Sequence, residues 1–491
     1  MYQFGLFGEA EMARLADGVL EVLERVGILC QNAGLLDALG TWGARVDRSQ
    51  EMVSFPRERV GGFVADLLQE RHVWPAEADG LGTVQQDYSV GQTSHEPQAT
   101  RLHAPDLPVL STQVAQFYLD HRTGERRPGS RADLITLIKL GDALHGEEGV
   151  GHSLLLQDVP PMLEPLEAAL LLAQYARKPA GAFAWDVRQV DYLIEMGEVL
   201  GVPNWYTLGA ICFSHPLRFD RDVADRFVRR VREGAPTGIT GMQVSGATTP
   251  VTVAGFVVVS AAEFVATWIA ARALNPQVPL VGSIWGGTVD MRTGTVSYSS
   301  PDGMLRAFAL AEFLRRWCGQ RVVVGGGEYC DARVPGRYAA LEKAYKAMTI
   351  AAFTGAHPVV GEGMVESGKT ISPVQLLLDR EYARGVQVLA EEVEVTDDAI
   401  GMDAILEVGQ GLTANYLQTA HTLHHYRRGL WLPELLSRTG WNGSEDEEAV
   451  LRRAKRRVEA LIDAYRQPEV DPDLLARLRQ IIDRARLRLA S

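Results

Sequence analysis

The chain has 491 residues, of which 46% are hydrophobic and 23% charged, the balance of an ordinary globular protein. Its 49 Lys and Arg against 62 Asp and Glu give a net charge of −13, which disfavours nucleic acid as a partner because phosphate contacts need clustered basic side chains. Four scattered cysteines without a Cys-x-x-Cys pair support neither a disulfide framework nor a zinc site. Because no apolar run reaches roughly 18 residues without a polar break and no signal-peptide pattern is found, we expect a cytoplasmic protein with no membrane contact.

Residues 1 to 75 show apolar positions mainly at helical spacing, with one strand fragment before Pro56, and predict a helical N-terminal cap. Residues 88 to 123 are rich in Gly, Pro and His, which favours hairpins and loops that could form a lid. Beyond residue 395 the pattern is purely helical, and Asp471-Pro472 is a typical start of its last helix. We therefore expect a C-terminal helical subdomain over residues 395–491.

Between these ends, apolar strand segments alternate with amphipathic helices, which is typical of a parallel sheet. Seven strands are predicted, and we expect an eighth from the region before residue 150. The best fit is an α/β fold, a (β/α)8 TIM barrel over residues 76–394. The predicted strands lie near 151–156, 180–184, 206–213, 237–243, 278–284, 320–325 and 357–361, and the helices near 162–176, 188–200, 219–233, 250–273, 301–317, 338–354 and 373–390.

Residues 242 to 294 form the central βαβ unit of this pattern. Thr249-Pro250 is expected to open its long apolar helix, with Thr as the cap and Pro in the first turn. Gln243 and Trp285 stand at the ends of the two strands. Since the loops that follow barrel strands build the active site, both are candidate substrate-binding residues.

Several motifs carry a resemblance that extends over nearly the whole chain: GATTPVTVAGF, the pair Ala262-Glu263, VDMRTG, GMVESGKTISPVQLLLDREYARG, YLDHRTGERRPGSRADL and HTLHHYR. With these, the sequence resembles the trimethylamine methyltransferase family. The resemblance implies a barrel fold and methyl transfer to a partner corrinoid protein. The founding members carry pyrrolysine, whereas this chain has only ordinary residues and is similar to the branch that demethylates quaternary amines such as glycine betaine.

A quaternary ammonium ion has no N–H group to donate, so aromatic faces and a nearby carboxylate are expected to hold it. Trp185 and Trp285 both follow predicted strands, and we predict that they line one cavity; the alternative is that either ring only closes the top of the barrel. His215 follows a third strand in CFSHPL and departs from the family pattern there. It is a further substrate-binding candidate, or a histidine bonded to a loop carbonyl.

Gly325, Gly326 and Gly327 follow the strand RVVV, and their missing Cβ atoms suggest close approach of substrate or corrin ring, unless the run is a plain turn. Tyr329 next to them is expected at the substrate. Glu328 and Cys330 are candidates for the place of pyrrolysine, although no activating partner for the thiol can be named. Glu328 is our first catalytic candidate.

Glu362 is the second catalytic candidate, because it follows the last predicted strand and could balance an ammonium charge or act as an acid. Glu366 nearby is as well explained by capping the next helix. Arg292 in VDMRTG could bind a substrate carboxylate, or form an internal ion pair with Asp290.

His421 and His424 lie one turn apart in HTLHH, a spacing that suits a metal ion, but no third ligand is evident nearby in the sequence. No metal site is predicted.

The leading hypothesis is a corrinoid-dependent methyltransferase that acts on a quaternary or tertiary methylamine, a betaine above all, and binds no cofactor tightly. Cobalamin would arrive on the partner corrinoid protein, because the chain lacks an Asp-x-His-x-x-Gly motif. Two alternatives stay open: a methyltransferase for another substrate, or a barrel that binds a methylamine or a corrinoid protein without turnover. Barrels of this size commonly form homo-oligomers, which we also expect here.

Overall fold

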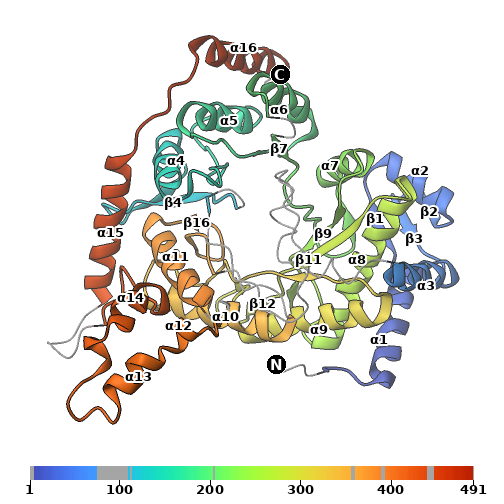
Figure 1. Ribbon diagram of the computed structural model, residues 1–491. Coiled ribbons are helices and arrows are strands. Elements are labelled where there is room, and N and C mark those ends of the chain that lie inside the picture. Colours follow the sequence, from blue (N-terminus) through green and yellow to red (C-terminus); the bar gives the residue numbers. More distant parts are fainter. Residues whose placement is uncertain are drawn as a thin grey trace.

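The computed structural model describes residues 5–73, 109–110, 113–202, 205–354, 360–388, 393–438 and 447–489 (Figure 1). Most of the predicted lid, residues 88 to 123, lies outside the described residues. The predicted mixed α/β class is confirmed, with helices and short strands alternating through the middle of the chain.

The seven helices predicted after residue 160 are all observed, with ends that differ by at most a few residues. The start of the longest is a correction: the Thr252 hydroxyl, not Thr249, accepts from the N–H of Gly255 and caps α8. Helix α8 is apolar and long enough to span a membrane, but most of it is buried inside the protein, as expected of a core helix. Together with α4 Arg131–His145, which precedes them, the seven helices are α5 Glu164–Tyr175, α6 Val187–Leu200, α7 Arg221–Arg232, α8 Val253–Leu274, α9 Pro301–Cys318, α10 Arg337–Thr354 and α11 Pro373–Val388.

The described strands form five small sheets and do not close into one eight-stranded sheet. One of these sheets is entirely parallel and has the strand order β14-β11-β9. In its register, Gly241 lies opposite Ile284, and Ile284 lies opposite Val324. The strands of this central region are β4 Phe117–Leu119, β5 Arg126–Pro128, β6 Ala182–Phe183, β7 Tyr206–Thr207, β9 Thr237–Gly241, β10 Val244–Ser245, β11 Leu280–Ile284, β12 Gly287–Asp290, β13 Thr295–Ser297, β14 Val323–Val324, β15 Met364–Val365 and β16 Thr370–Ile371.

Backbone contacts extend these sheets so that each strand segment lies beside the next one along the chain. Parallel bridges join 115 to 154 and 150 to 179, and β6 pairs in parallel with β7. The N–H of Thr240 donates to Ile211 O, and that of Gly361 to Gly327 O, at 2.9 and 3.2 Å. The carboxyl ends of neighbouring parallel segments therefore meet on one side.

The N-terminal segment is not only helical. Its three strands pair in the order β2-β3-β1-β8, and β8 (Arg218–Phe219) comes from the central region, so backbone pairing ties this segment to the rest of the protein. Apolar side chains of its helices share one hydrophobic core with α7, α8 and α9. The elements are α1 Glu9–Glu21, η1 Val22–Val26, β1 Ile28–Cys30, α2 Ala33–Trp42, β2 Arg45–Asp47, β3 Met52–Ser54 and α3 Arg57–Val73.

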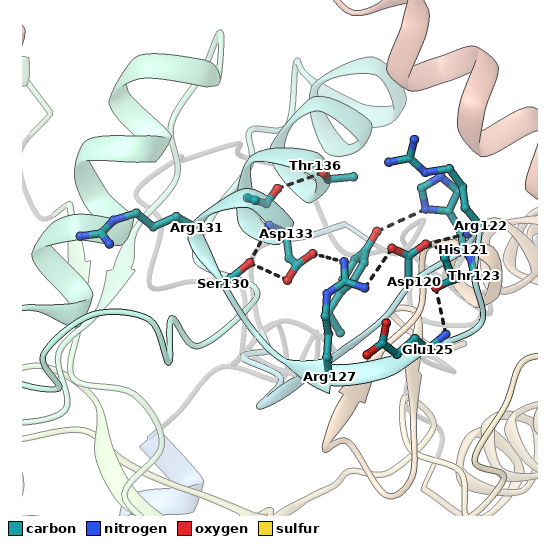
Figure 2. Close-up of polar contacts among 12 residues, drawn as sticks. Asp120, His121, Arg122, Thr123, Glu125, Arg127, Ser130, Arg131, Asp133 and Thr136 are labelled. Atoms are coloured by element: carbon teal, nitrogen blue, oxygen red, sulfur yellow. Dashed lines mark hydrogen bonds and ion pairs between the residues drawn. The ribbon is translucent and has the colours of Figure 1, made fainter.

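The hairpin β4–β5 explains the family motif YLDHRTGERRPGSRADL as a folding element (Figure 2). Arg127 lies between two carboxylates and bonds Asp120 at 2.9 Å and the buried Asp133 at 2.6 Å. Ser130 caps α4 by accepting from the N–H of Asp133, and its hydroxyl donates back to that carboxylate. One guanidinium thus fixes the hairpin to the start of the helix.

The C-terminal part consists of helices, among which α16 packs against α5 and α6, and α15 against α4 and α11 (Figure 1). These contacts form the second hydrophobic core. Along the chain, α12, α13 and α14 lie between α11 and α15, and α13 extends outward at the lower left of Figure 1. The elements are α12 Asp397–Ile400, α13 Met402–Val408, η3 Tyr416–Gln418, α14 Ala420–Gly429, α15 Glu447–Ala464 and α16 Pro472–Leu489.

Candidate active site

The residues that follow β9, β11 and β14 lie beside one another because these strands are parallel and in register. The N–H of Trp285 donates to Gly241 O, that of Gly287 to Gln243 O, and that of Gly325 to Ile284 O. Gln243, Trp285 and the Gly325 run therefore stand at one edge of the sheet, as predicted for an active site built on strand ends.

Trp285 and Glu328 form the centre of this edge. The indole Nε1 donates to Glu328 Oε1 at 2.8 Å, and the N–H of Gly326 donates to Oε2 at 3.0 Å. Both side chains are buried, at 3% and 2% exposed. Each of the two carboxylate oxygens of Glu328 thus accepts one N–H donor, which fixes the orientation of the side chain.

Glycines next to this pair leave room for the side chains of Trp285 and Lys346. A Cβ on Gly325 would lie 2.2 Å from ring atoms of Trp285, and one on Gly326 would lie 3.0 Å from Lys346 Nζ. The φ of Gly326 is +118°, a conformation that side chains rarely adopt. The spaces beside these two glycines are thus filled by the protein's own side chains, while the Gly327 carbonyl bonds the next strand segment.

Lys346 on α10 is a member of the cluster that the sequence reading missed. It is fully buried, and Nζ donates to Tyr329 O at 2.9 Å, to Tyr298 O at 3.2 Å and to Ser299 Oγ at 3.2 Å. Desolvation lowers the pKa of Lys346 to about 8, although the nearby Glu328 charge acts in the opposite direction. A Lys in the helix pattern KAYKA gives no sign of this, because the side chain is expected to be solvated.

Tyr329 packs beside Trp285, with ring centroids 6.3 Å apart and planes tilted by 37°. Its hydroxyl donates to Gln113 Oε1 at 3.2 Å. Desolvation, together with the charges of Glu328 and Glu362, raises the pKa of Tyr329 well above 10, so it is a neutral phenol. Because the charge of Glu362 acts on Tyr329, Glu362 also lies near this cluster.

Gln243, His215 and Glu263 form a second group at the same edge. Gln243 Nε2 donates to Glu263 Oε2 at 2.5 Å, and His215 Nδ1 lies 3.0 Å from the same oxygen. The N–H of Met242 donates to His215 Nε2, so that nitrogen is the acceptor and Nδ1 carries the proton in the neutral ring. Gln243 is fully buried, and its Oε1 accepts no hydrogen bond from the described part of the chain.

Glu263 lies on α8 and was noted only as part of a motif. It also accepts from the N–H of Leu217 at 2.6 Å, which holds the loop after His215. The structure therefore explains the Ala262-Glu263 pair as the support of two predicted site residues.

Trp185 forms a separate aromatic cluster. Its Nε1 donates to Glu164 Oε2 at 2.8 Å, its ring stacks on Phe183 at 5.8 Å, and His152 meets it edge to face at 6.2 Å. His152 also lies 2.9 Å from Glu164. No ring contact or hydrogen bond among the described residues joins Trp185 to Trp285, so one cavity lined by both stays a prediction.

Arg292 lies at the tip of the β12–β13 hairpin, with its side chain 89% exposed. It bonds Asp290 through Nη2 at 3.1 Å and Nε at 3.2 Å, and this bonding lowers the pKa of the Asp290 carboxyl. The internal ion pair is thus the alternative that is observed, and a substrate-binding role for Arg292 stays a prediction.

The contacts of Glu366 and the burial of Cys330 favour structural roles for these two candidates. Glu366 accepts from Arg126 and Thr370, each at 2.7 Å, and joins the loop to β5. Burial raises the pKa of Cys330 to about 11, so the thiol is protonated at neutral pH and is no nucleophile. All four cysteines are free.

Comparisons with known proteins agree with the motifs. The family model described as trimethylamine methyltransferase matches residues 89–490. A trimethylamine methyltransferase of Desulfitobacterium hafniense (strain DSM 10664 / DCB-2) is 23% identical over 98% of this chain and 94% of its own. A glycine betaine methyltransferase of D. hafniense (strain Y51) is 26% identical over 98% and 97%. A trimethylamine methyltransferase of Methanosarcina mazei is 28% identical over 56% of this chain and 55% of its own. The chain is therefore a methyltransferase that belongs to the trimethylamine methyltransferase family.

Proposed function

We propose that this methyltransferase moves a methyl group from a quaternary methylamine, a betaine, to cobalt(I) of a partner corrinoid protein. The match to a glycine betaine methyltransferase over nearly the full length of both chains supports this substrate class. The absence of pyrrolysine from the sequence agrees with it.

The observation that carries the proposal is the buried cluster of Trp285, Tyr329 and Glu328. Two neighbouring aromatic rings and a carboxylate held by N–H donors are what a cation without N–H groups needs. The indole donates to the acid that would face the ammonium charge, so ring and carboxylate are fixed relative to each other.

The charges of the cluster favour a cation. Glu328 and Glu362 bring two carboxylates, and Lys346 is the ammonium group that couples to Glu328. Carboxyl groups near Lys346 and Tyr329 outnumber the ammonium group, and this excess favours a cation because charge is poorly screened in the interior. A bound quaternary ammonium would balance it.

Methyl transfer from such a substrate needs positioning rather than acid catalysis. The C–N bond breaks with its electron pair left on nitrogen, so a quaternary substrate leaves as a neutral tertiary amine and no proton is required. When bound, the corrinoid of the partner supplies the cobalt(I) nucleophile. Trp285 and Tyr329 would orient the methyl-bearing nitrogen, and Glu328 would hold its charge. We assign no corrin contact to Gly325 or Gly326, whose neighbouring space is filled, and a contact at Gly327 stays a prediction.

We also propose that the central region is a (β/α)8 barrel in which the hydrogen bonding between neighbouring strands is discontinuous, so that it divides into small sheets. The parallel contacts between successive strand segments support this, including the bridge from 115 to 154 that supplies a strand before residue 150. A cytoplasmic location and self-association belong to the same proposal.

The test is an anaerobic assay with purified protein, cob(I)alamin and either glycine betaine or trimethylamine, followed by the absorbance of methylcob(III)alamin. We expect transfer from glycine betaine, none from trimethylamine, and no turnover without corrinoid. The protein as isolated should contain no stoichiometric cobalamin. Binding of glycine betaine without transfer would favour the non-catalytic alternative, and transfer from trimethylamine would overturn the substrate class.

A further inference from the structure

The helices α12 and α14 bring together acidic and histidine side chains that are far apart in the sequence. Asp398 on α12 and His424 and His425 on α14 each offer a ligand atom, and these atoms all lie within 4.8 Å of one another. The sequence pattern HTLHH lacked a third ligand, and the fold supplies it from a residue 26 positions before His424.

The contacts of His425 and His424 show how the two rings lie relative to Asp398. His425 Nε2 lies 3.2 Å from Asp398 Oδ2, yet this nitrogen is shielded from solvent and makes no hydrogen bond to any residue that the structure describes. The rings of His424 and His425 meet nearly at right angles, with centroids 4.8 Å apart. A shielded imidazole nitrogen beside a carboxylate, without hydrogen-bond geometry to it, is free to bind a metal ion with its lone pair.

His421 supports the arrangement from one turn earlier on α14. Its Nε2 donates to the carbonyl oxygen of Asp398 at 3.0 Å, and its ring lies 4.4 Å from that of His425. A Cβ on Gly401 would lie 2.6 Å from the His421 ring, so a glycine with φ of +66° is what permits α12 to approach α14 so closely.

We propose that Asp398, His424 and His425 form a binding site for a divalent transition-metal ion of the zinc class. Two imidazoles and one carboxylate are a ligand set that zinc uses, with a remaining position open to water or to a further ligand. The Asp398 side chain is 75% exposed, so an ion can enter directly from solvent. Bound there, it would link α12 to α14 across the intervening residues 401–419.

The experiment uses the untagged full-length protein, treated with a chelator and titrated with Zn²⁺ by calorimetry, with circular dichroism as the check on folding. We expect one stoichiometric site in the wild type. The double variant His424→Gln/His425→Gln should weaken binding by more than about 100-fold, since even residues that only support metal ligands contribute roughly 10- to 100-fold.

The matched controls are Asp398→Asn against Asp397→Asn, neighbouring acids on the same helix, and Tyr426→Phe, the next residue on α14. Asp398→Asn should weaken Zn²⁺ binding, whereas Asp397→Asn and Tyr426→Phe should bind as the wild type does. A wild type that takes up no stoichiometric Zn²⁺, or a folded double variant that binds it equally well, would overturn the proposal. Neither result bears on methyl transfer, because metal stoichiometry is measured without substrate or corrinoid.

Discussion

Trp185 and Trp285 invite comparison because both follow a strand, and both donate Nε1 to a buried glutamate at 2.8 Å. Their surroundings differ in exposure: Trp185 is 38% exposed and Trp285 3%. They differ also in charge, since Glu164 has His152 in direct contact at 2.9 Å, whereas the Lys346 ammonium is bonded to two carbonyls and a hydroxyl instead of to Glu328.

The difference shows that a strand-end tryptophan with its acid is not by itself a cation site. Burial acts to raise the pKa of Glu164, but the contact with His152 and hydrogen bonds from Leu156 and Trp185 outweigh it and lower that pKa. Among the described residues, no histidine or other cation forms an ion pair with Glu328, and the charges of Glu328 and Glu362 both act on Tyr329. We therefore expect a substrate cation beside Trp285 rather than beside Trp185.

The largest expected effect comes from truncating the two rings. Trp285→Ala should cost about 3 to 5 kcal/mol of unfolding free energy, because it leaves a cavity in a buried cluster. Trp185→Ala should cost roughly 1 to 2 kcal/mol, because part of the ring is already in contact with solvent. Urea denaturation of both variants measures the difference, and equal losses would mean that the contrast in burial is wrong.

A smaller loss is expected when the space beside the Trp285 ring is filled. Gly325→Ala should cost about 1 to 3 kcal/mol, because its Cβ would lie 2.2 Å from the ring. Gly61→Ala is the matched control: this residue is exposed in α3 with nothing within 4 Å of the new Cβ, so a gain of up to about 1 kcal/mol is expected. Both are read from the same denaturation experiment.

The pH dependence of stability tests the buried ammonium. The pKa of Lys346 falls from 10.5 to about 8 on folding, so between these values the unfolded chain binds more protons and stability rises with pH. Relative to Lys346→Met, the wild type should gain stability as the pH rises from about 8 to about 10.5, and the difference should be constant below pH 8, where Lys346 is protonated in both states. A difference between the two proteins that does not change with pH would show that Lys346 is not desolvated.

The smallest effect is expected at the hairpin tip. Arg292→Gln should leave stability unchanged, because its pair with Asp290 is exposed to solvent. The KM for glycine betaine should also stay the same if the guanidinium serves only this pair. A raised KM at unchanged stability would restore the predicted role in binding the substrate carboxylate.

The helices could be predicted closely because capping residues and the spacing of apolar residues are local properties of the sequence. Asp471-Pro472 at the start of α16 is an example. Five of the seven predicted strand segments contain an observed strand, but these strands are short, because pairing with neighbours is not encoded in any one segment. The segment 151–156 contains only an isolated bridge at Leu154, and most of 357–361 lies outside the described residues. The start of α8 was misjudged since three threonines precede it, and only the folded structure shows which hydroxyl caps the helix.

The site was predictable where a residue follows a strand and not where it comes from a helix. Gln243, Trp285 and Glu328 were found from strand ends, and the contacts place them together. Glu263, Lys346 and Glu164 lie on helices whose patterns do not show which polar side chains turn inward. Asp398 was missed for another reason: it lies far along the chain from the histidines it approaches.

The account depends most on the claim that the cluster of Trp285 and Glu328, not that of Trp185 and Glu164, holds the substrate. The direct test compares kcat/KM for glycine betaine in the cob(I)alamin assay between Glu328→Gln and Glu164→Gln. We expect Glu328→Gln to lower kcat/KM roughly 30-fold or more, which corresponds to a loss of about 2 kcal/mol of transition-state stabilisation. Glu164→Gln should change kcat/KM little. A folded Glu328→Gln with full activity beside an inactive Glu164→Gln would contradict the account.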